Sequence, residues 1–245
     1  MSPCQCCLPN GDHAVRFRRR GILTAAALAC LGLPGPARAA GPAADQRMTP
    51  DQAIAALMDG NARYRAGTAL PTASTPAHRA ALAAGQAPFA AILGCADSRA
   101  APELLFHAGR GALFVVRNAG NIADTGAVGS LEYAVAHLGV SVIMVLGHER
   151  CGAASAAVST VQATSPDPAM PAQLGDMLLP MLPAALAGIR GGNDVVDGAV
   201  RANVRRSAAR LTEVSPLIAG AQSSGRIRIV GAYYDLDDEK VSLLG

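Results

Sequence analysis

Two apolar runs, each followed at once by polar side chains that can bind metals or transfer protons, constrain the fold more than any other feature of the sequence. The run 89–94 leads into Cys95-Ala96-Asp97-Ser98-Arg99, and the run 141–147 leads into His148-Glu149-Arg150-Cys151. Apolar runs of this length are typical of strands buried on both faces of a parallel sheet. Open α/β sheets bind ligands at the carboxyl ends of their strands. Both polar stretches are therefore expected at one edge of one sheet.

Strand and helix patterns alternate along the rest of the chain. A capping box, Thr49-Pro50-Asp51-Gln52, predicts a helix that stops near Gly67, and a second short helix is predicted from Thr75-Pro76 to Gly85. Further helices are expected from Pro102, around 129–138, from Gly152, and on either side of Gly191-Gly192; further strands are expected at 112–117, 226–234 and 240–244. This alternation predicts an α/β fold with a mainly parallel central sheet flanked by helices and with an N-terminal helical arm.

Residues 1–39 have the pattern of an export signal. Arg16 and 18–20 form a basic region, 22–33 form a short apolar region, and Ala37-Arg38-Ala39 offers a cleavage site. Arg19-Arg20 further resembles a twin-arginine signal. The alternative is a disordered basic tail. We predict a mature domain over residues 40–245 that is periplasmic or secreted.

The charge of the chain changes sign when this leader is removed. Five of the 21 Lys and Arg residues and one of the 18 Asp and Glu residues lie in 1–39, which leaves 16 basic and 17 acidic residues in 40–245. A nucleic-acid partner is therefore not expected. The predicted mature part contains no apolar run that we expect to span a membrane.

The cysteines also divide between leader and domain. Four of the six lie in the leader, so Cys95 and Cys151 remain. They could form one disulfide. The alternative that we favour is a shared metal, with His148 as a third ligand, because two thiolates and one imidazole suit a catalytic zinc site with an open fourth position. Asp97 and Arg99 next to these ligands point to catalysis.

The motifs together resemble those of the β-class carbonic anhydrases, from about residue 50 to the end. Gln86 and Pro88 match that family, and the longer matching stretches are Cys95-Ala96-Asp97-Ser98-Arg99, Phe114-Val115-Val116-Arg117-Asn118-Ala119-Gly120-Asn121, Ser130-Leu131-Glu132-Tyr133-Ala134-Val135, Gly147-His148-Glu149-Arg150-Cys151-Gly152 and Gly231-Ala232-Tyr233-Tyr234-Asp235-Leu236. Glu149 departs from the family, which usually has a small polar residue there. The sequence has no Trp to build the bicarbonate-regulated site of some members.

The resemblance implies a role for each matching residue. Cys95, His148 and Cys151 would bind Zn²⁺. Asp97 would hydrogen-bond the zinc-bound water or become the fourth ligand in a closed state, and Arg99 would hold Asp97 off the metal. The residues that would line the substrate pocket, partly from a neighbouring subunit, are Gln86, Phe114, Ala119 and Tyr133. This sharing implies a dimer or tetramer.

The chemistry of these residues suits the hydration of carbon dioxide to bicarbonate. Zinc can lower the pKa of a bound water to about 7 in favourable sites. The resulting hydroxide would attack CO₂, while Arg99 keeps Asp97 ionised and oriented. The alternatives are hydrolysis of CS₂ or COS by the same site, a non-catalytic zinc-binding protein, and a binding module held by a disulfide.

Overall fold

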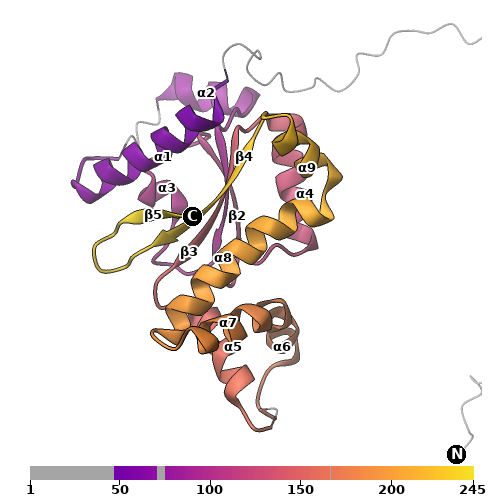
Figure 1. Cartoon of the computed structure of the whole chain (residues 1–245). Coiled ribbons are helices and arrows are strands. Elements are labelled where there is room, and N and C mark those ends of the chain that lie inside the picture. Colours follow the sequence, from indigo (N-terminus) through magenta and orange to yellow (C-terminus); the bar gives the residue numbers. More distant parts are fainter. Residues whose placement is uncertain (1–46, 71–74, 166) are drawn as a thin grey trace, which may run out of the picture. The chain divides into compact units, whose positions relative to one another are not determined.

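The computed structural model describes residues 47–70, 75–165 and 167–245. The predicted export signal lies outside these residues. A five-stranded sheet forms the centre, in the order β2-β1-β3-β4-β5 (Figure 1). Its strands are β1 (Ala90–Cys95), β2 (Leu113–Asn118), β3 (Val142–His148), β4 (Arg228–Tyr234) and β5 (Val241–Leu244). Only β5 is antiparallel to its neighbour among the pairs β1–β2, β1–β3, β3–β4 and β4–β5. The predicted α/β fold with a mainly parallel sheet is confirmed.

Helices surround this sheet. They are α1 (Pro50–Arg65), α2 (Pro76–Ala84), α3 (Pro102–Leu105), α4 (Thr125–Tyr133), α5 (Gly152–Gln162), α6 (Ala172–Leu178), α7 (Leu182–Gly191), α8 (Val195–Val214) and α9 (Pro216–Ser223), with a π-helix η2 (Ala134–Leu138) and a 3₁₀ helix η3 (Leu179–Met181). In Figure 1, α1 and α3 lie on one side of the sheet and α4 and α9 on the other. Helices α5, α6 and α7 group beyond the carboxyl ends of the strands.

The first helices begin where the sequence predicts. Thr49 accepts from Gln52 N, and the Gln52 side chain accepts from Thr49 N, so the predicted capping box at the start of α1 is present. Thr75 caps α2 in a similar way through His78 N. Hydrogen bonds of this kind satisfy backbone donors that the first helical turn leaves free.

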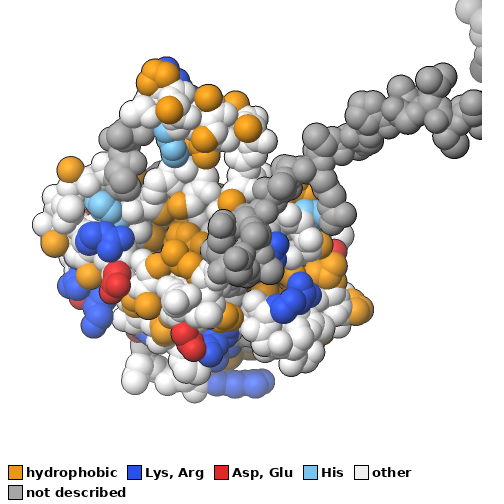
Figure 2. All heavy atoms as spheres, turned by 90° about the horizontal axis from the view of Figure 1, so that it is seen from above, with side chains coloured by type: hydrophobic (Ala, Val, Ile, Leu, Met, Phe, Trp, Pro, Cys, Tyr) orange, Lys and Arg blue, Asp and Glu red, His pale blue; other side chains and the backbone are white. Residues whose placement is uncertain are grey.

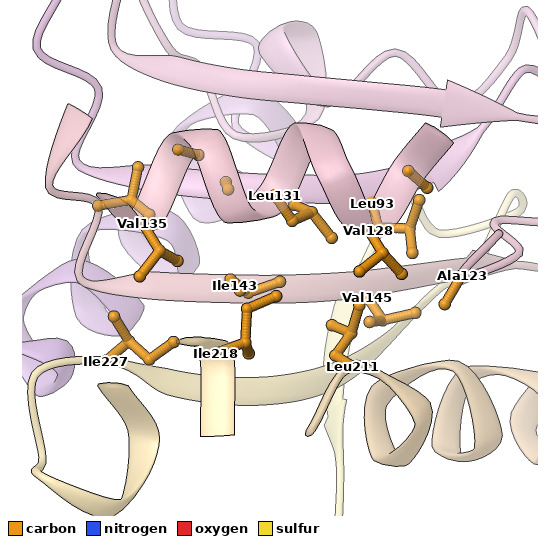
Figure 3. Packing of buried hydrophobic residues seen from close by; sticks show 14 of the residues in the cluster. Leu93, Ala123, Val128, Leu131, Val135, Ile143, Val145, Leu211, Ile218 and Ile227 are labelled. Carbon is orange, nitrogen blue, oxygen red and sulfur yellow. The ribbon is translucent and has the colours of Figure 1, made fainter. Parts of the chain in front are cut away.

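Buried side chains fill both faces of the sheet. On one face, Leu93 and Val145 from the strands pack against Leu131 of α4 and Leu211 of α8 (Figure 3). On the other, Ile92 and Met144 pack with Leu57 of α1. A third cluster contains Cys95 and Cys151 together with apolar residues of α5, α7 and α8. Cys95 and Cys151 therefore lie in closely packed surroundings.

The region after α5 differs from the prediction. We expected two helices separated by Gly191-Gly192, but the structure has α6, η3 and α7 before this pair and α8 and α9 after it. Prolines explain the additional breaks, because Pro180, Pro183 and Pro216 each lie at the first or second position of a new element. A proline cannot donate the backbone hydrogen bond that a continuous helix needs.

By length and composition alone, the stretch Ala172–Gly191 could cross a membrane. We expected no such stretch. In the structure it is divided into α6, η3 and α7, and residues such as Leu178, Met181 and Ala185 are buried in the third core cluster. Packing against α5 and α8 accounts for these three residues, while 28% of the apolar window as a whole is buried.

Some large apolar side chains also reach the surface. They include Leu104, Tyr133 and Leu179. Figure 2, which shows the molecule from above, has a group of hydrophobic side chains near the centre of that face. Scattered apolar residues are ordinary on protein surfaces, so exposure alone does not mark a residue as part of a functional site.

Candidate active site

Three residues of types that can bind a metal ion meet at the carboxyl edge of the sheet. Cys95 is the last residue of β1, and His148 is the last residue of β3. The two strands are parallel neighbours paired through Gly94 and Leu146, so their ends lie at nearly the same level. Cys151 follows three residues later and immediately precedes α5. Two strand ends and one helix start therefore bring the three residues to one place.

The geometry of these residues fits a metal ion. Ligand atoms of Cys95, His148 and Cys151 all lie within 4.8 Å of one another. The residues are 6%, 1% and 2% exposed, respectively. His148 Nδ1 lies 2.9 Å from Glu149 O and must donate to it, because a carbonyl oxygen only accepts. Among the described residues, His148 Nε2 is buried and has no hydrogen-bond partner. A buried imidazole lone pair beside two sulfurs is expected to bind a metal.

The two thiols differ in their acidity. The pKa of Cys95 is lowered, first because the Cys151 thiol can donate to its sulfur and further because His148 and the Gly120 N–H stabilise the thiolate. The pKa of Cys151 is raised because it shares its proton with Cys95 and because it is buried. Burial lowers the pKa of His148, but Cys95, the backbone of Glu149 and Asp97 together raise it above its ordinary value. One of the two cysteines is thus readily held as a thiolate, and a bound cation would stabilise the second cysteine as a thiolate too.

A carboxylate–guanidinium pair lies beside the three residues. Arg99 Nε donates to Asp97 Oδ1 at 2.9 Å, and Arg99 Nη2 donates to Asp97 Oδ2 at 2.8 Å. This bidentate pair is the one expected from the sequence. It lowers the pKa of Asp97 well below its usual range. Asp97 Oδ2 is 3.9 Å from His148 Nε2, so the carboxylate is held next to the candidate metal position with both oxygens facing Arg99.

Arg117 holds the backbone of this site. Its Nε donates to Cys95 O at 2.8 Å, and its Nη2 donates to Asp97 O at 2.6 Å. The structure shows that it holds the loop that carries the first cysteine and the carboxylate.

Two supporting residues were not singled out from the sequence. The Gly120 N–H donates to Cys95 Sγ at 3.3 Å, and the buried side chain of Asn203 donates to Gly120 O at 2.7 Å. The positive φ of Gly120, 78°, is conformationally suited to glycine. Gly120 belongs to a stretch that matches the family, but its position there did not indicate this role, and nothing in the sequence connects Asn203, on α8, to it.

The four residues expected to line a substrate pocket differ in their surroundings. Gln86 is exposed and Ala119 is half-buried. Phe114 and Tyr133 are close together, with ring centroids 6.2 Å apart. Phe114 pairs with Ala91, four residues before Cys95, which corresponds to about 13 Å along the strand. The chain thus brings Phe114 and Tyr133 to each other but not to its own metal-ligating residues.

The fold and the site define the class of the protein: an α/β protein with a Cys, His, Cys group that could hold a metal ion at the carboxyl edge of a mainly parallel sheet. Comparisons with known proteins agree. The sequence model of the carbonic anhydrase family matches residues 90–241. Carbonic anhydrase 2 of Mycobacterium tuberculosis is 41% identical over 195 residues, which cover 79% of this chain and 92% of that protein. The carbonic anhydrase of Pseudomonas aeruginosa is 37% identical over 172 residues, 66% of this chain and 76% of that protein.

Solved structures lead to the same family. A tetrameric β-carbonic anhydrase from Sordaria macrospora superimposes with a TM-score of 0.62 at 27% identity, covering 76% of this chain and 92% of that one. A Coccomyxa β-carbonic anhydrase in complex with acetazolamide gives a TM-score of 0.58 at 29% identity, covering 67% and 75%. The chain belongs to the β-carbonic anhydrases, enzymes whose general reaction is the hydration of carbon dioxide. The resemblance seen in the sequence is confirmed.

Proposed function

We propose that the protein is a zinc enzyme that reversibly hydrates carbon dioxide to bicarbonate and a proton, with Cys95, His148 and Cys151 as its metal ligands. The observation that carries the proposal is the buried, unpartnered Nε2 of His148 beside two buried thiols. Sulfur and nitrogen ligands suit zinc, whereas magnesium and calcium prefer oxygen.

The metal and its ligands would have separate roles. Zinc in this position would lower the pKa of a water molecule toward neutrality and so supply the nucleophile for CO₂. Cys95 and Cys151 would bind as thiolates, and their two negative charges would balance the dication. The hydrogen bond from His148 Nδ1 to Glu149 O orients the imidazole, so that Nε2 would be free to bind a metal held with the two cysteines.

Asp97 and Arg99 are the proposed catalytic pair. Asp97 would accept a hydrogen bond from the nucleophile and orient it toward CO₂. Arg99 keeps Asp97 ionised and aligned through two parallel hydrogen bonds. If Asp97 turned away from Arg99, its carboxylate would be close enough to become a fourth protein ligand and close the site.

The substrate pocket is proposed to include residues of a second subunit. Phe114 and Tyr133 lie on β2, an edge strand of the sheet, and on α4, and Tyr133 is 47% exposed. Because Phe114 is about 13 Å from the level of its own Cys95, it would line the site of a neighbour. Gln86 and Ala119 would complete the pocket. A dimer or tetramer follows, and the Sordaria macrospora relative is described as tetrameric.

We further propose that residues 1–39 are an export signal and that residues 40–245 act in the periplasm or after secretion. The family match, 90–241, falls within the proposed mature domain.

The experiment that tests the function measures CO₂ hydration by stopped flow and CS₂ hydrolysis on one preparation of known zinc content. We expect hydration that rises in proportion to bound zinc and disappears in Cys151→Ala. Rapid CS₂ turnover without CO₂ hydration would contradict the proposed substrate. Full zinc occupancy with neither reaction would contradict the proposed catalysis.

A further inference from the structure

We propose that Arg150 and Asp237 form a positioning pair that keeps Asp97 bound to Arg99 and away from the metal. The inference rests on the proposed function, because it needs a metal at the Cys, His, Cys group. The pair would influence the metal site from the turn between β4 and β5, a segment that holds none of the proposed ligands.

The backbone of Arg150 contacts Arg99 directly. Arg150 lies between His148 and Cys151 and has a φ of 51°, in the left-handed region that non-glycine residues rarely adopt. Its carbonyl oxygen accepts a hydrogen bond from Arg99 Nη2 at 3.4 Å. The same nitrogen donates to Asp97 Oδ2 at 2.8 Å. The position of the Arg150 carbonyl therefore influences how Arg99 is held against Asp97.

The side chain of Arg150 is fixed by the turn between β4 and β5. Its Nη2 donates to Asp237 Oδ1 at 2.7 Å, and its Nη1 donates to Asp237 Oδ2 at 3.0 Å. Nη1 also donates to Glu149 Oε1 at 3.2 Å. Glu149 Oε2 in turn accepts from the backbone N–H of Leu236 at 3.0 Å.

This arrangement is more than an isolated surface ion pair. The side chains of Arg150 and Asp237 are 52% and 73% exposed, and isolated pairs with such exposure contribute little. Here, however, the pair is bidentate and joins a network with Glu149. Bidentate and networked pairs are the surface ion pairs that make a measurable contribution. Glu149 N also donates to Tyr234 O at 2.8 Å. The turn thus holds the segment between two proposed metal ligands from both its backbone and its side chains.

Loss of the Asp237 charge should shift the position of Asp97. In Asp237→Asn, Arg150 would lose one of its two acceptors on residue 237 and the charge that strengthens the other, so its carbonyl would be held less firmly against Arg99. Asp97 Oδ2 is only 3.9 Å from His148 Nε2, so a small movement away from Arg99 would bring the carboxylate to the metal. A larger Asp97-ligated fraction lowers the apparent affinity of any anion for the open metal position in proportion.

The test uses cobalt-substituted protein, whose visible absorption reports the ligands of the metal, and titrates it with azide. We compare the wild type with Asp237→Asn, with the charge-conserving Asp237→Glu, and with Asp176→Asn as a control. Asp176 is an exposed residue of α6 outside the site. Its change to Asn alters the net charge by the same amount as Asp237→Asn. We expect Asp237→Asn to weaken azide binding about threefold, in the range for one exposed, well-aligned charge pair. Asp237→Glu should recover part of this loss, and Asp176→Asn should match the wild type.

A second comparison separates the side-chain contacts from backbone strain. Arg150→Gly and Arg150→Ala both remove the pair with Asp237, but only glycine relieves the left-handed conformation. The proposal predicts weaker azide binding in both variants. Wild-type affinity in Arg150→Gly or in Asp237→Asn would overturn it. If the wild type itself binds no metal, the proposed function fails instead.

Discussion

Replacement of Gly120 by alanine should destabilise the protein and weaken its hold on the metal. Gly120 has a φ of 78°, and a Cβ placed there would lie 2.6 Å from Met181 Sδ and 3.2 Å from the Ala153 Cβ. Its N–H donates to Cys95 Sγ. Any backbone shift that makes room for the methyl group therefore moves a donor away from a proposed metal ligand.

The magnitude follows from the conformation. A residue with a Cβ costs about 1–2 kcal/mol in the left-handed region, and the contact with Met181 adds to this only partly because methionine is flexible. For a domain of this size, such a loss lowers Tm by roughly 2–8 °C. Loss of a supporting contact to a metal ligand typically reduces metal affinity about 10–100-fold.

The assay pairs thermal unfolding of the zinc-loaded protein with zinc release to a chelator. The matched control is Gly220→Ala in α9, where the added Cβ meets no atom within 4 Å. A helical glycine-to-alanine change is favourable by up to about 1 kcal/mol, so the control should keep or raise Tm and release zinc at the wild-type rate. Equal Tm and equal zinc release for Gly120→Ala and the wild type would refute the reasoning.

The remaining predictions concern catalysis, assembly and the thiols. Asp97→Asn should retain zinc and lose about 10²–10⁴-fold in turnover, the usual contribution of a proton-accepting or orienting group. Wild-type turnover in a variant sample with the same zinc content as the wild type would exclude this role. The active protein should sediment as a dimer or tetramer, and a fully active monomer would contradict the shared pocket. Metal-free protein treated with a thiol oxidant should join Cys95 to Cys151, whose sulfurs lie within 4.8 Å, whereas zinc-loaded protein should keep both thiols free on titration after denaturation; equal thiol counts would contradict this.

The sheet and its metal-ligating residues could be predicted because their signals are local. Each apolar run gives its strand, and the ligand follows within one to four residues, so no long-range contact has to be known. The bidentate pair of Asp97 with Arg99 is local too, because the two residues are two positions apart. Parallel pairing of β1 with β3 then brings the two local signals together.

The supports of the site could not be predicted in this way. The contact of Asn203 with Gly120 joins residues 83 positions apart, and that of Arg150 with Asp237 joins residues 87 positions apart. Such pairs depend on how α8 and the last turn pack on the sheet, and no periodicity in the sequence specifies that packing. The roles of Phe114 and Tyr133 came from the family resemblance, and the strand register explains why they are separated from their own metal-ligating residues.

The most direct measurement of the central claim is CO₂ hydration during stepwise return of zinc to metal-free protein, with Cys95→Ala, His148→Ala and Cys151→Ala in parallel. The proposed function predicts hydration that rises linearly and reaches its plateau at one zinc per chain, and three variants without tightly bound zinc or activity. Hydration by metal-free wild type, or full hydration by any of the three variants, would contradict it.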